Sequence, residues 1–163
     1  VAGQLTDHYD PRSKTLRLSE GIYESASVAA LGIAAHECGH AIQDREGYKP
    51  LKIRGALVPV ANLGSGASWL LILLGVVMGL YNLIGLGIIL FSAVVLFQLV
   101  TLPVELNASR RALAALEGAG FLYEDELPKA RKVLSAAALT YVAAALTSVL
   151  QLLRLILLFG RRD

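Results

Sequence analysis

A run of 50 residues without a single charge, residues 55–104, constrains the fold of this chain more than any other feature. A membrane-spanning helix needs about 20 residues, so this run can form two such helices joined by a tight turn. We expect the turn near Tyr81 and Asn82. The alternative is a long buried helical hairpin in a soluble protein, but an uncharged run of this length favours a membrane.

A second uncharged stretch, residues 133–153, lies in a helix that we expect to run from Pro128 to about Phe159. It is long enough to cross a membrane once more. The composition agrees, because 55% of the 163 residues are hydrophobic and 17% are charged, against about 25% charged residues in globular proteins. The sequence therefore predicts a mainly α-helical integral membrane protein with three crossings.

The polar N-terminal part predicts a small edge strand or hairpin and one helix, as in a zincin-like fold. Leu16 and Leu18 alternate with basic residues in the segment Lys14–Leu18, which indicates a short strand, around Thr15–Ser19, exposed on one face. The Ala-rich run that follows predicts a helix over residues 26–44, with Ser25 or Ser27 as its N-cap.

Polar segments connect these elements into one expected domain over residues 1–163. Gly47 and Pro50 predict a basic loop over residues 44–54. A further helix is expected over residues 103–117, with Pro103 at its first position and Gly118 and Gly120 ending it. The parts of the domain are then a strand and helix over 1–54, a transmembrane hairpin over 55–104, a helix and loop over 105–132 and a third transmembrane helix over 133–160. Because the chain begins with Val1, we expect an N-terminal segment to be missing.

The sequence His36-Glu37-Cys38-Gly39-His40 carries the strongest chemical signal. Residues four apart lie on one face of a helix, so His36 and His40 can bind the same zinc ion. Glu37 flanks that face, where it can act as general base towards water activated by zinc and pass the proton to a leaving amine. This is the chemistry of the HExxH pattern, and the alternative is a pair of surface histidines on an ordinary helix.

A catalytic zinc usually has three protein ligands and keeps a fourth position for water, so a third ligand is needed. His8 is the only other histidine, and Cys38 faces away from His36 on the helix, where we expect it to pack. Glu105 follows the second predicted crossing directly. Two crossings return Glu105 to the side of His36 and His40, whereas a single crossing would leave it on the other side. The sequence therefore predicts a site of two histidines and one glutamate, and a favourable interaction of Glu105 with a helix dipole is compatible with it.

Four segments together resemble a known family. They are LTDHYDP at 5–11, TLRLS at 15–19, HECGHAIQ at 36–43 and LPVELNASRRAL at 102–113. In combination they resemble the YugP-type neutral zinc metallopeptidases of bacteria and, more distantly, the HtpX-type and CAAX-prenyl membrane proteases, over essentially the whole chain. The resemblance implies that His36, His40 and Glu105 bind one zinc ion and that Glu37 is the general base. It also implies a further transmembrane segment before Val1.

The resemblance leaves the residues around the ligands open. In HtpX-type relatives an Asp follows the ligand Glu by four positions and supports a histidine, whereas this chain has Ser109 there; Asn107 and Ser109 are both candidates for that support. His8 or Tyr141 can donate a hydrogen bond to the oxyanion of the tetrahedral intermediate, but residues of these types are more often structural. Likewise, the strand over Thr15–Ser19 can pair with an extended substrate or simply form the edge of a small sheet.

The distribution of basic residues predicts the orientation. Seven Lys or Arg residues precede the hairpin and five lie between Glu105 and the uncharged stretch 133–153, against three at the far end of the last helix, namely Arg154, Arg161 and Arg162. The positive-inside rule then places the catalytic side in the cytoplasm. A net charge of +2 without a basic stripe gives no support to a nucleic-acid partner, and a single cysteine excludes an internal disulfide.

The sequence thus predicts a zinc-dependent endopeptidase, a multi-pass protein of the bacterial cytoplasmic membrane that hydrolyses proteins or peptides at the cytoplasmic surface. Its partners are the substrate and the lipid bilayer. The alternative is a zinc-binding membrane scaffold or regulatory pseudoprotease without turnover, which would not need Glu37 beside its first ligand. A transporter is disfavoured, because the hairpin lacks the acids or bases that mark ion pathways.

Overall fold

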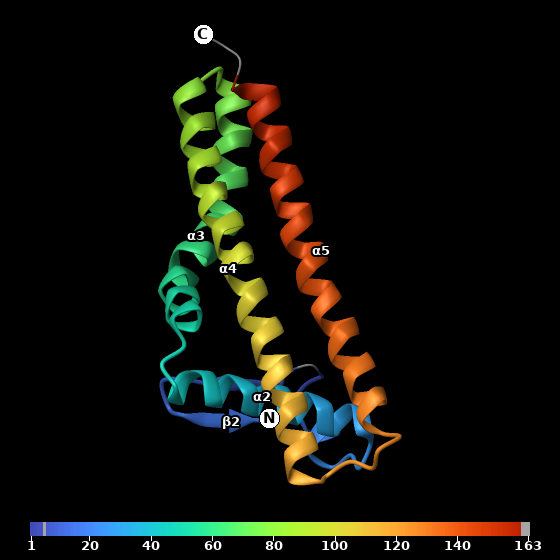
Figure 1. Cartoon of the computed structure of the whole chain (residues 1–163). Coiled ribbons are helices and arrows are strands. Elements are labelled where there is room, and N and C mark those ends of the chain that lie inside the picture. Colours follow the sequence, from blue (N-terminus) through green and yellow to red (C-terminus); the bar gives the residue numbers. More distant parts are fainter. Residues whose placement is uncertain (5, 161–163) are drawn as a thin grey trace. The chain divides into compact units, whose positions relative to one another are not determined.

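The computed structural model describes residues 1–4 and 6–160, which form two compact units. The described parts of the first unit are Val1–Lys52 and Pro103–Thr140, and those of the second are Ile53–Leu102 and the segment from Tyr141 onward. Three long helices, α3, α4 and α5, have residues in both units (Figure 1). Three residues used in the sequence analysis lie outside the described residues: Leu5, which begins the segment at 5–11, and Arg161 and Arg162.

A β-hairpin begins the first unit. Strands β1 (His8–Asp10) and β2 (Thr15–Arg17) pair antiparallel, with Tyr9 opposite Leu16. The prediction of β2 is confirmed, and its pairing with β1 forms the hairpin that was one of the two predicted forms, although the position of β1 was not predicted; the short helix α1 (Glu20–Tyr23) was not expected. Three residues of a polar segment are too few to show the alternation of a half-buried strand.

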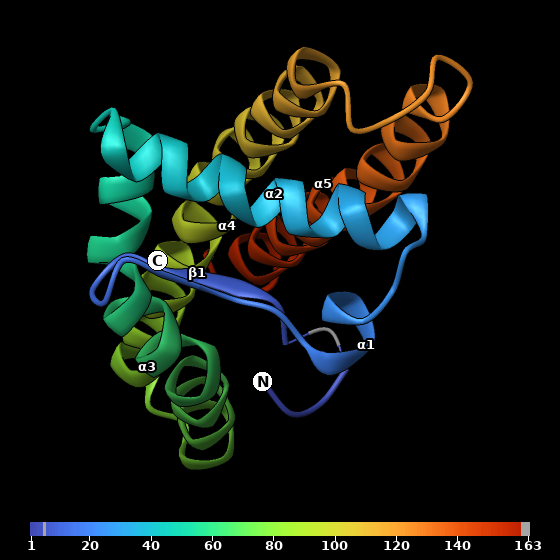
Figure 2. The same ribbon diagram turned by 90° about the horizontal axis from the view of Figure 1, so that it is seen from below.

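Helix α2 (Val28–Arg45) carries the HExxH sequence and agrees with the predicted helix to within two residues. The hydroxyl of Ser27 accepts a hydrogen bond from the backbone N–H of Ala30 at 3.1 Å, so Ser27 is the N-cap. The hairpin lies against α2 (Figure 2), and the Tyr9 hydroxyl donates to Asp44 Oδ2 at 2.8 Å. This contact fixes the hairpin beside the C-terminal half of α2.

The core of the first unit is made mostly of small side chains. Parts of α2, α4 (Tyr81–Ala119) and α5 (Leu127–Phe159) meet there. The buried residues of the cluster are Ala35, Ala112, Leu116, Ala130 and Leu134. Because alanine side chains are short, the helix backbones can approach closely. The closest approach is at Gly39, where an added Cβ would lie 2.4 Å from the carbonyl oxygen of Ala108.

In the second unit, α3 (Lys49–Met78) and α4 form an antiparallel hairpin (Figure 1). Gly79 ends α3 with a left-handed φ of 69°, and the N–H of Leu80 donates to the carbonyl of Gly75 at 2.8 Å. This is the Schellman arrangement, in which glycine adopts the left-handed conformation without a steric cost. The turn therefore lies immediately before Tyr81, close to its predicted position.

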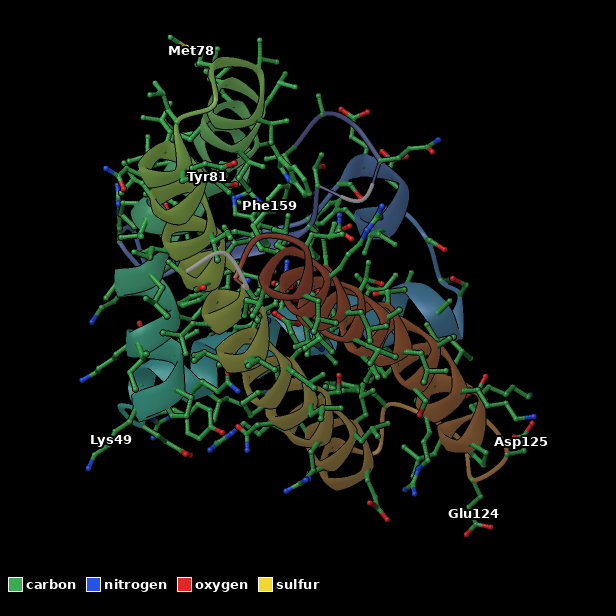
Figure 3. All side chains as sticks on the ribbon, turned by 90° about the horizontal axis from the view of Figure 1, so that it is seen from above. Lys49, Met78, Tyr81, Glu124, Asp125 and Phe159 are labelled. Atoms are coloured by element: carbon green, nitrogen blue, oxygen red, sulfur yellow. The ribbon has the colours of Figure 1, made fainter. Side chains whose placement is uncertain are left out.

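Large apolar side chains cover the outward faces of the second unit. A small core of Ile72, Phe91, Val95 and Leu155 lies inside it. Other apolar side chains point away from the helices (Figure 3), and those more than half exposed include Leu70, Leu73, Val77, Ile89 and Leu157. All three long helices, of 30, 39 and 33 residues, are long and apolar enough to cross a membrane. The predicted mainly helical class with a small sheet and long apolar helices is confirmed.

Two predicted helix starts are wrong, and proline is the reason in both cases. Helix α3 begins at Lys49 rather than after Arg54, because Pro50 fits within the first turn, where backbone N–H groups have no intrahelical acceptor. Helix α4 continues through Pro103, which was expected to begin a new helix. The lost hydrogen bond is offset by packing, since Val104 and Ala108 just beyond it are completely buried.

The end of α4 and the start of α5 lie close to their predicted positions. Gly120, with a φ of 65°, follows the last residue of α4, whereas Gly118 lies inside the helix. Helix α5 begins at Leu127, one residue before Pro128, and ends at Phe159 as expected.

We predict that Gly39→Ala destabilises the protein, because the new Cβ must displace the backbone of α4 at Ala108. Overpacking of this kind costs about 1–3 kcal/mol. Gly118→Ala is the matched control, since an added Cβ there meets no atom within 4 Å and alanine favours a helix. Thermal unfolding of both variants in detergent measures the difference; equal melting temperatures would contradict the close approach of α2 to α4.

Candidate metal centre

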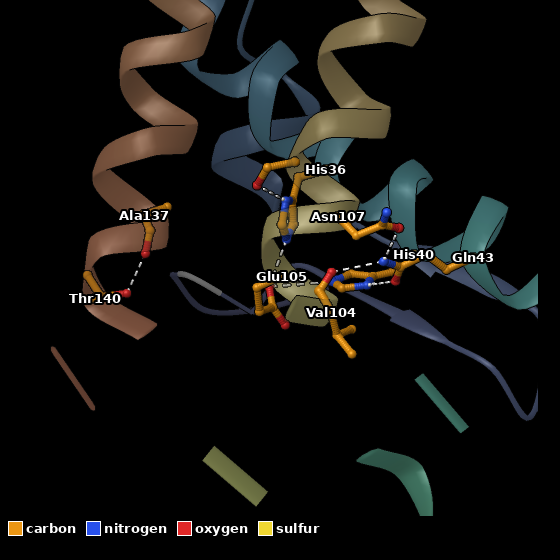
Figure 4. Close-up of polar contacts among 9 residues, drawn as sticks. His36, His40, Gln43, Val104, Glu105, Asn107, Ala137 and Thr140 are labelled. Atoms are coloured by element: carbon orange, nitrogen blue, oxygen red, sulfur yellow. Dashed lines mark hydrogen bonds and ion pairs between the residues drawn. The ribbon is translucent and has the colours of Figure 1, made fainter. Parts of the chain in front are cut away.

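Three side chains that can bind a metal ion converge in the first unit. His36 and His40 lie on α2 and Glu105 lies on α4, and one ligand atom from each lies within 4.8 Å of the others. The Nε2 atom of His36 is 3.0 Å from Glu105 Oε2, and that of His40 is 3.6 Å from the same oxygen (Figure 4). The structure therefore brings Glu105 to the histidine pair, as the sequence predicted.

The donor set and its spacing fit a zinc ion. Two imidazole nitrogens and one carboxylate oxygen are a frequent ligand set of catalytic zinc. In a tetrahedral site with bonds of 2.0–2.1 Å, ligand atoms are about 3.4 Å apart. The two distances to Glu105 Oε2, 3.0 and 3.6 Å, lie on either side of that value. All three ligand atoms lie within 4.8 Å of one another, so a shift of side chains alone could bring them to the spacing of a bound ion.

The electrostatics of the site favour a cation. Glu105 is 2% exposed, and a carboxylate at such a position needs positive charge nearby. Burial lowers the pKa of His40, but the hydrogen bond and negative charge of Glu105 raise it by more, so the pKa lies above its usual value. The buried carboxylate thus attracts positive charge to the Nε2 side of the ring, where a zinc ion would bind.

The other nitrogen of each histidine ring contacts a polar side chain. His36 Nδ1 is 3.0 Å from Ser109 Oγ, and His40 Nδ1 is 3.0 Å from Gln43 Oε1. Such contacts orient the Nε2 atoms of metal-binding histidines towards the metal. Ser109 was one of two candidates for this support, whereas the other, Asn107, contacts Gln43 rather than a histidine.

Sequence reasoning missed the contact of Gln43 with His40. The signal was present, because a residue three positions after His40 lies on nearly the same face of the helix. Nothing in the sequence alone distinguishes a glutamine that turns inward there from one that faces solvent.

Glu37 and Cys38, between the two histidines, have different surroundings. Glu37 is 9% exposed and forms no hydrogen bond or ion pair with any residue that the structure describes. Cys38 is exposed, so the expectation that it packs is wrong. The protein around the Cys38 thiol still removes part of its hydration. This loss of hydration and the negative charge of Glu37 raise the pKa of the thiol, which disfavours the thiolate that a metal would require.

His8 and Tyr141 were the two residues considered for the oxyanion. His8 is an exposed residue of β1 whose Nδ1 lies 2.7 Å from the carbonyl oxygen of Thr6. Tyr141 belongs to the second unit and is partly buried. An oxyanion-stabilising role of either residue stays a prediction.

We predict that Glu105→Ala weakens zinc binding by a factor on the order of a hundred or more, because it removes one of three ligands. The measurement is the zinc content of the purified chain after dialysis against a weak chelator. Glu117→Ala, at an exposed position of the same helix, is the matched control and should retain zinc. Equal zinc content in both variants would show that Glu105 is not a ligand.

Comparisons with known proteins agree with the geometry. A family model described as "Putative neutral zinc metallopeptidase" matches residues 1–160. A protein of Bacillus subtilis (strain 168), "Putative membrane protease YugP", is 54% identical over 159 residues, which cover 98% of this chain and 71% of that protein. No solved structure matches the chain significantly. The family implies zinc, which suits the cluster of His36, His40 and Glu105. The chain therefore belongs to the neutral zinc metallopeptidase family.

Proposed function

We propose that this protein is a zinc-dependent endopeptidase that hydrolyses peptide bonds of proteins or peptides at the cytoplasmic membrane surface. The convergence of His36, His40 and Glu105, with Glu37 between the histidines, is the observation that carries the proposal. The family and the membrane protease relative support the same class of reaction.

His36 and His40 would hold one zinc ion through their Nε2 atoms, and Glu105 through its carboxylate. When bound, zinc lowers the pKa of water and polarises a carbonyl group. The hydrogen bonds at the Nδ1 atoms keep both rings directed towards the same point. This is the gluzincin arrangement, an HExxH helix with a downstream glutamate.

Glu37 would act as the general base. It accepts a proton from water as the water oxygen attacks the carbonyl carbon of the peptide bond, and it donates that proton to the leaving nitrogen. Because no described residue holds its carboxylate in a hydrogen bond or ion pair, Glu37 is available for both transfers. Its position next to His36 in α2 keeps the carboxylate near the ligands.

We further propose that the whole chain is one multi-pass membrane domain with the crossings at residues 55–104 and 133–160. Helix α4 has 39 residues, so it is about 58 Å long, nearly twice the hydrocarbon thickness of a bilayer. Its charge-free part ends at Val104, and Glu105 is the first charge after it. The metal ligand would then lie at the membrane surface, on the cytoplasmic side that the excess of basic residues indicates.

The test of the proposed reaction is Glu37→Gln, which keeps the shape of the side chain but removes the base. We predict unchanged zinc content and a loss of peptide hydrolysis of about 10²–10⁴-fold, the usual contribution of a general base. The rate of hydrolysis of a membrane-reconstituted protein substrate is measured for each variant, and the zinc content of the same protein samples is measured in parallel. Glu117→Gln is the control. A Glu37→Gln protein that hydrolyses substrate at the normal rate would exclude the role of Glu37, and no hydrolysis by the unaltered chain would favour a zinc-binding scaffold.

A further inference from the structure

Gln43 is a completely buried polar side chain whose amide contacts three other groups. It is 0% exposed. Its Oε1 atom lies 3.0 Å from His40 Nδ1. Its Nε2 atom donates to the carbonyl oxygen of Val104 at 2.8 Å and to Asn107 Oδ1 at 2.9 Å. Both N–H groups of the amide are therefore used, and Figure 4 shows these contacts beside Glu105.

These contacts determine which end of the Gln43 amide faces His40. A backbone carbonyl can only accept a hydrogen bond, so the atom next to Val104 O must be the amide nitrogen. The amide oxygen then faces His40, and it can only accept. Nδ1 of His40 must therefore carry a proton, so the neutral ring has its lone pair on Nε2, directed towards Glu105.

A second chain of contacts enforces the same orientation. Arg111 Nε donates to Asn107 Oδ1 at 2.7 Å, and a guanidinium group can only donate. The Asn107 oxygen thus accepts from Arg111 and from Gln43 together. Because Arg111 can only donate, it determines which group donates and which accepts in each hydrogen bond from Arg111 through Asn107 and Gln43 to the His40 ring.

The outer end of this network is anchored to the C-terminal end of α2. Arg111 Nη1 donates to Glu46 Oε2 at 2.6 Å, and the guanidinium carbon lies 5.9 Å from the centre of the Tyr48 ring. Glu46 is the C-cap of α2 and Arg111 lies on α4, so the network joins the two helices that supply the metal ligands.

Val104 immediately precedes Glu105, so Gln43 contacts one histidine and the backbone next to the carboxylate ligand. We propose that Gln43 is a positioning residue of the zinc site, which holds His40 in the tautomer with a free Nε2 and fixes the place of Glu105 relative to it. Asn107 and Arg111 set the direction of the Gln43 amide. The inference rests on the proposed zinc site.

The first test is Gln43→Met, a side chain of similar length without an amide. The zinc dissociation constant of the full chain in detergent is measured by competition with a chelator. We expect binding to weaken about 10–100-fold, the usual effect of losing a group that orients a metal ligand. The absorption spectrum of the cobalt-substituted protein should also change, because it reports the geometry of the ligands. Gln151→Met in α5, outside the network, is the matched control.

A pair of substitutions at Asn107 tests the direction of the hydrogen bonds and does not alter the buried glutamine. In its contacts with Gln43 and Arg111, Asn107 uses only its oxygen as an acceptor. Asn107→Asp keeps an acceptor there and should bind zinc within about threefold of the unaltered chain, whereas Asn107→Leu should bind about tenfold more weakly. If Asn107 were needed only for packing, the Asp and Leu variants would not differ in zinc binding in this way.

The inference is overturned if Gln43→Met binds zinc as tightly as the control, or if the Asp and Leu variants at position 107 weaken binding equally. Should Gln43→Met fail to fold, the Asn107 pair alone decides. His36→Ala distinguishes failure of this inference from failure of the proposed function: if it too retains zinc, the metal site itself is wrong.

Discussion

A buried carboxylate organises the first unit. Glu105 is 2% exposed, and at such a position its charge requires compensation by positive charge or by hydrogen bonds. Two imidazole rings face it, and its hydrogen bond and negative charge hold the pKa of His40 above the usual value despite burial. A divalent cation between these three groups satisfies the carboxylate and uses both rings as neutral ligands. The same buried charge that would destabilise an ordinary helix pair thus makes this pair suited to bind zinc.

Close packing of α2 against α4 is the condition for this contact. Gly39 lies between the two histidines, and its lack of a side chain lets the carbonyl of Ala108 approach the helix. Ala108 and Ala112 are completely buried on the facing helix. Any larger residue at Gly39 would move α4 away and would separate Glu105 from the rings. Small residues therefore have as much influence on the site as the ligands themselves.

The parts of the structure that the sequence predicted follow from spacing and from charge. The i, i+4 spacing places His36 and His40 together on any helix, and the charge-free hairpin brings Glu105 back to them. The start of α3 and the separate helix expected to begin at Pro103 were mispredicted, because a proline signals a helix start only when the neighbouring packing allows it. The role of Gln43 was also not predictable, since its contacts depend on Val104 and Asn107, more than 60 positions away.

The central claim is that one zinc ion is bound by two imidazoles and a carboxylate at Glu105. X-ray absorption at the zinc edge of the purified, zinc-loaded chain tests it most directly. The expected spectrum shows only nitrogen and oxygen neighbours at about 2.0–2.2 Å, with the outer-shell scattering of two imidazole rings. A sulfur neighbour at about 2.3 Å, which only Cys38 or Met78 could supply, or the scattering of fewer than two imidazoles would contradict the claim.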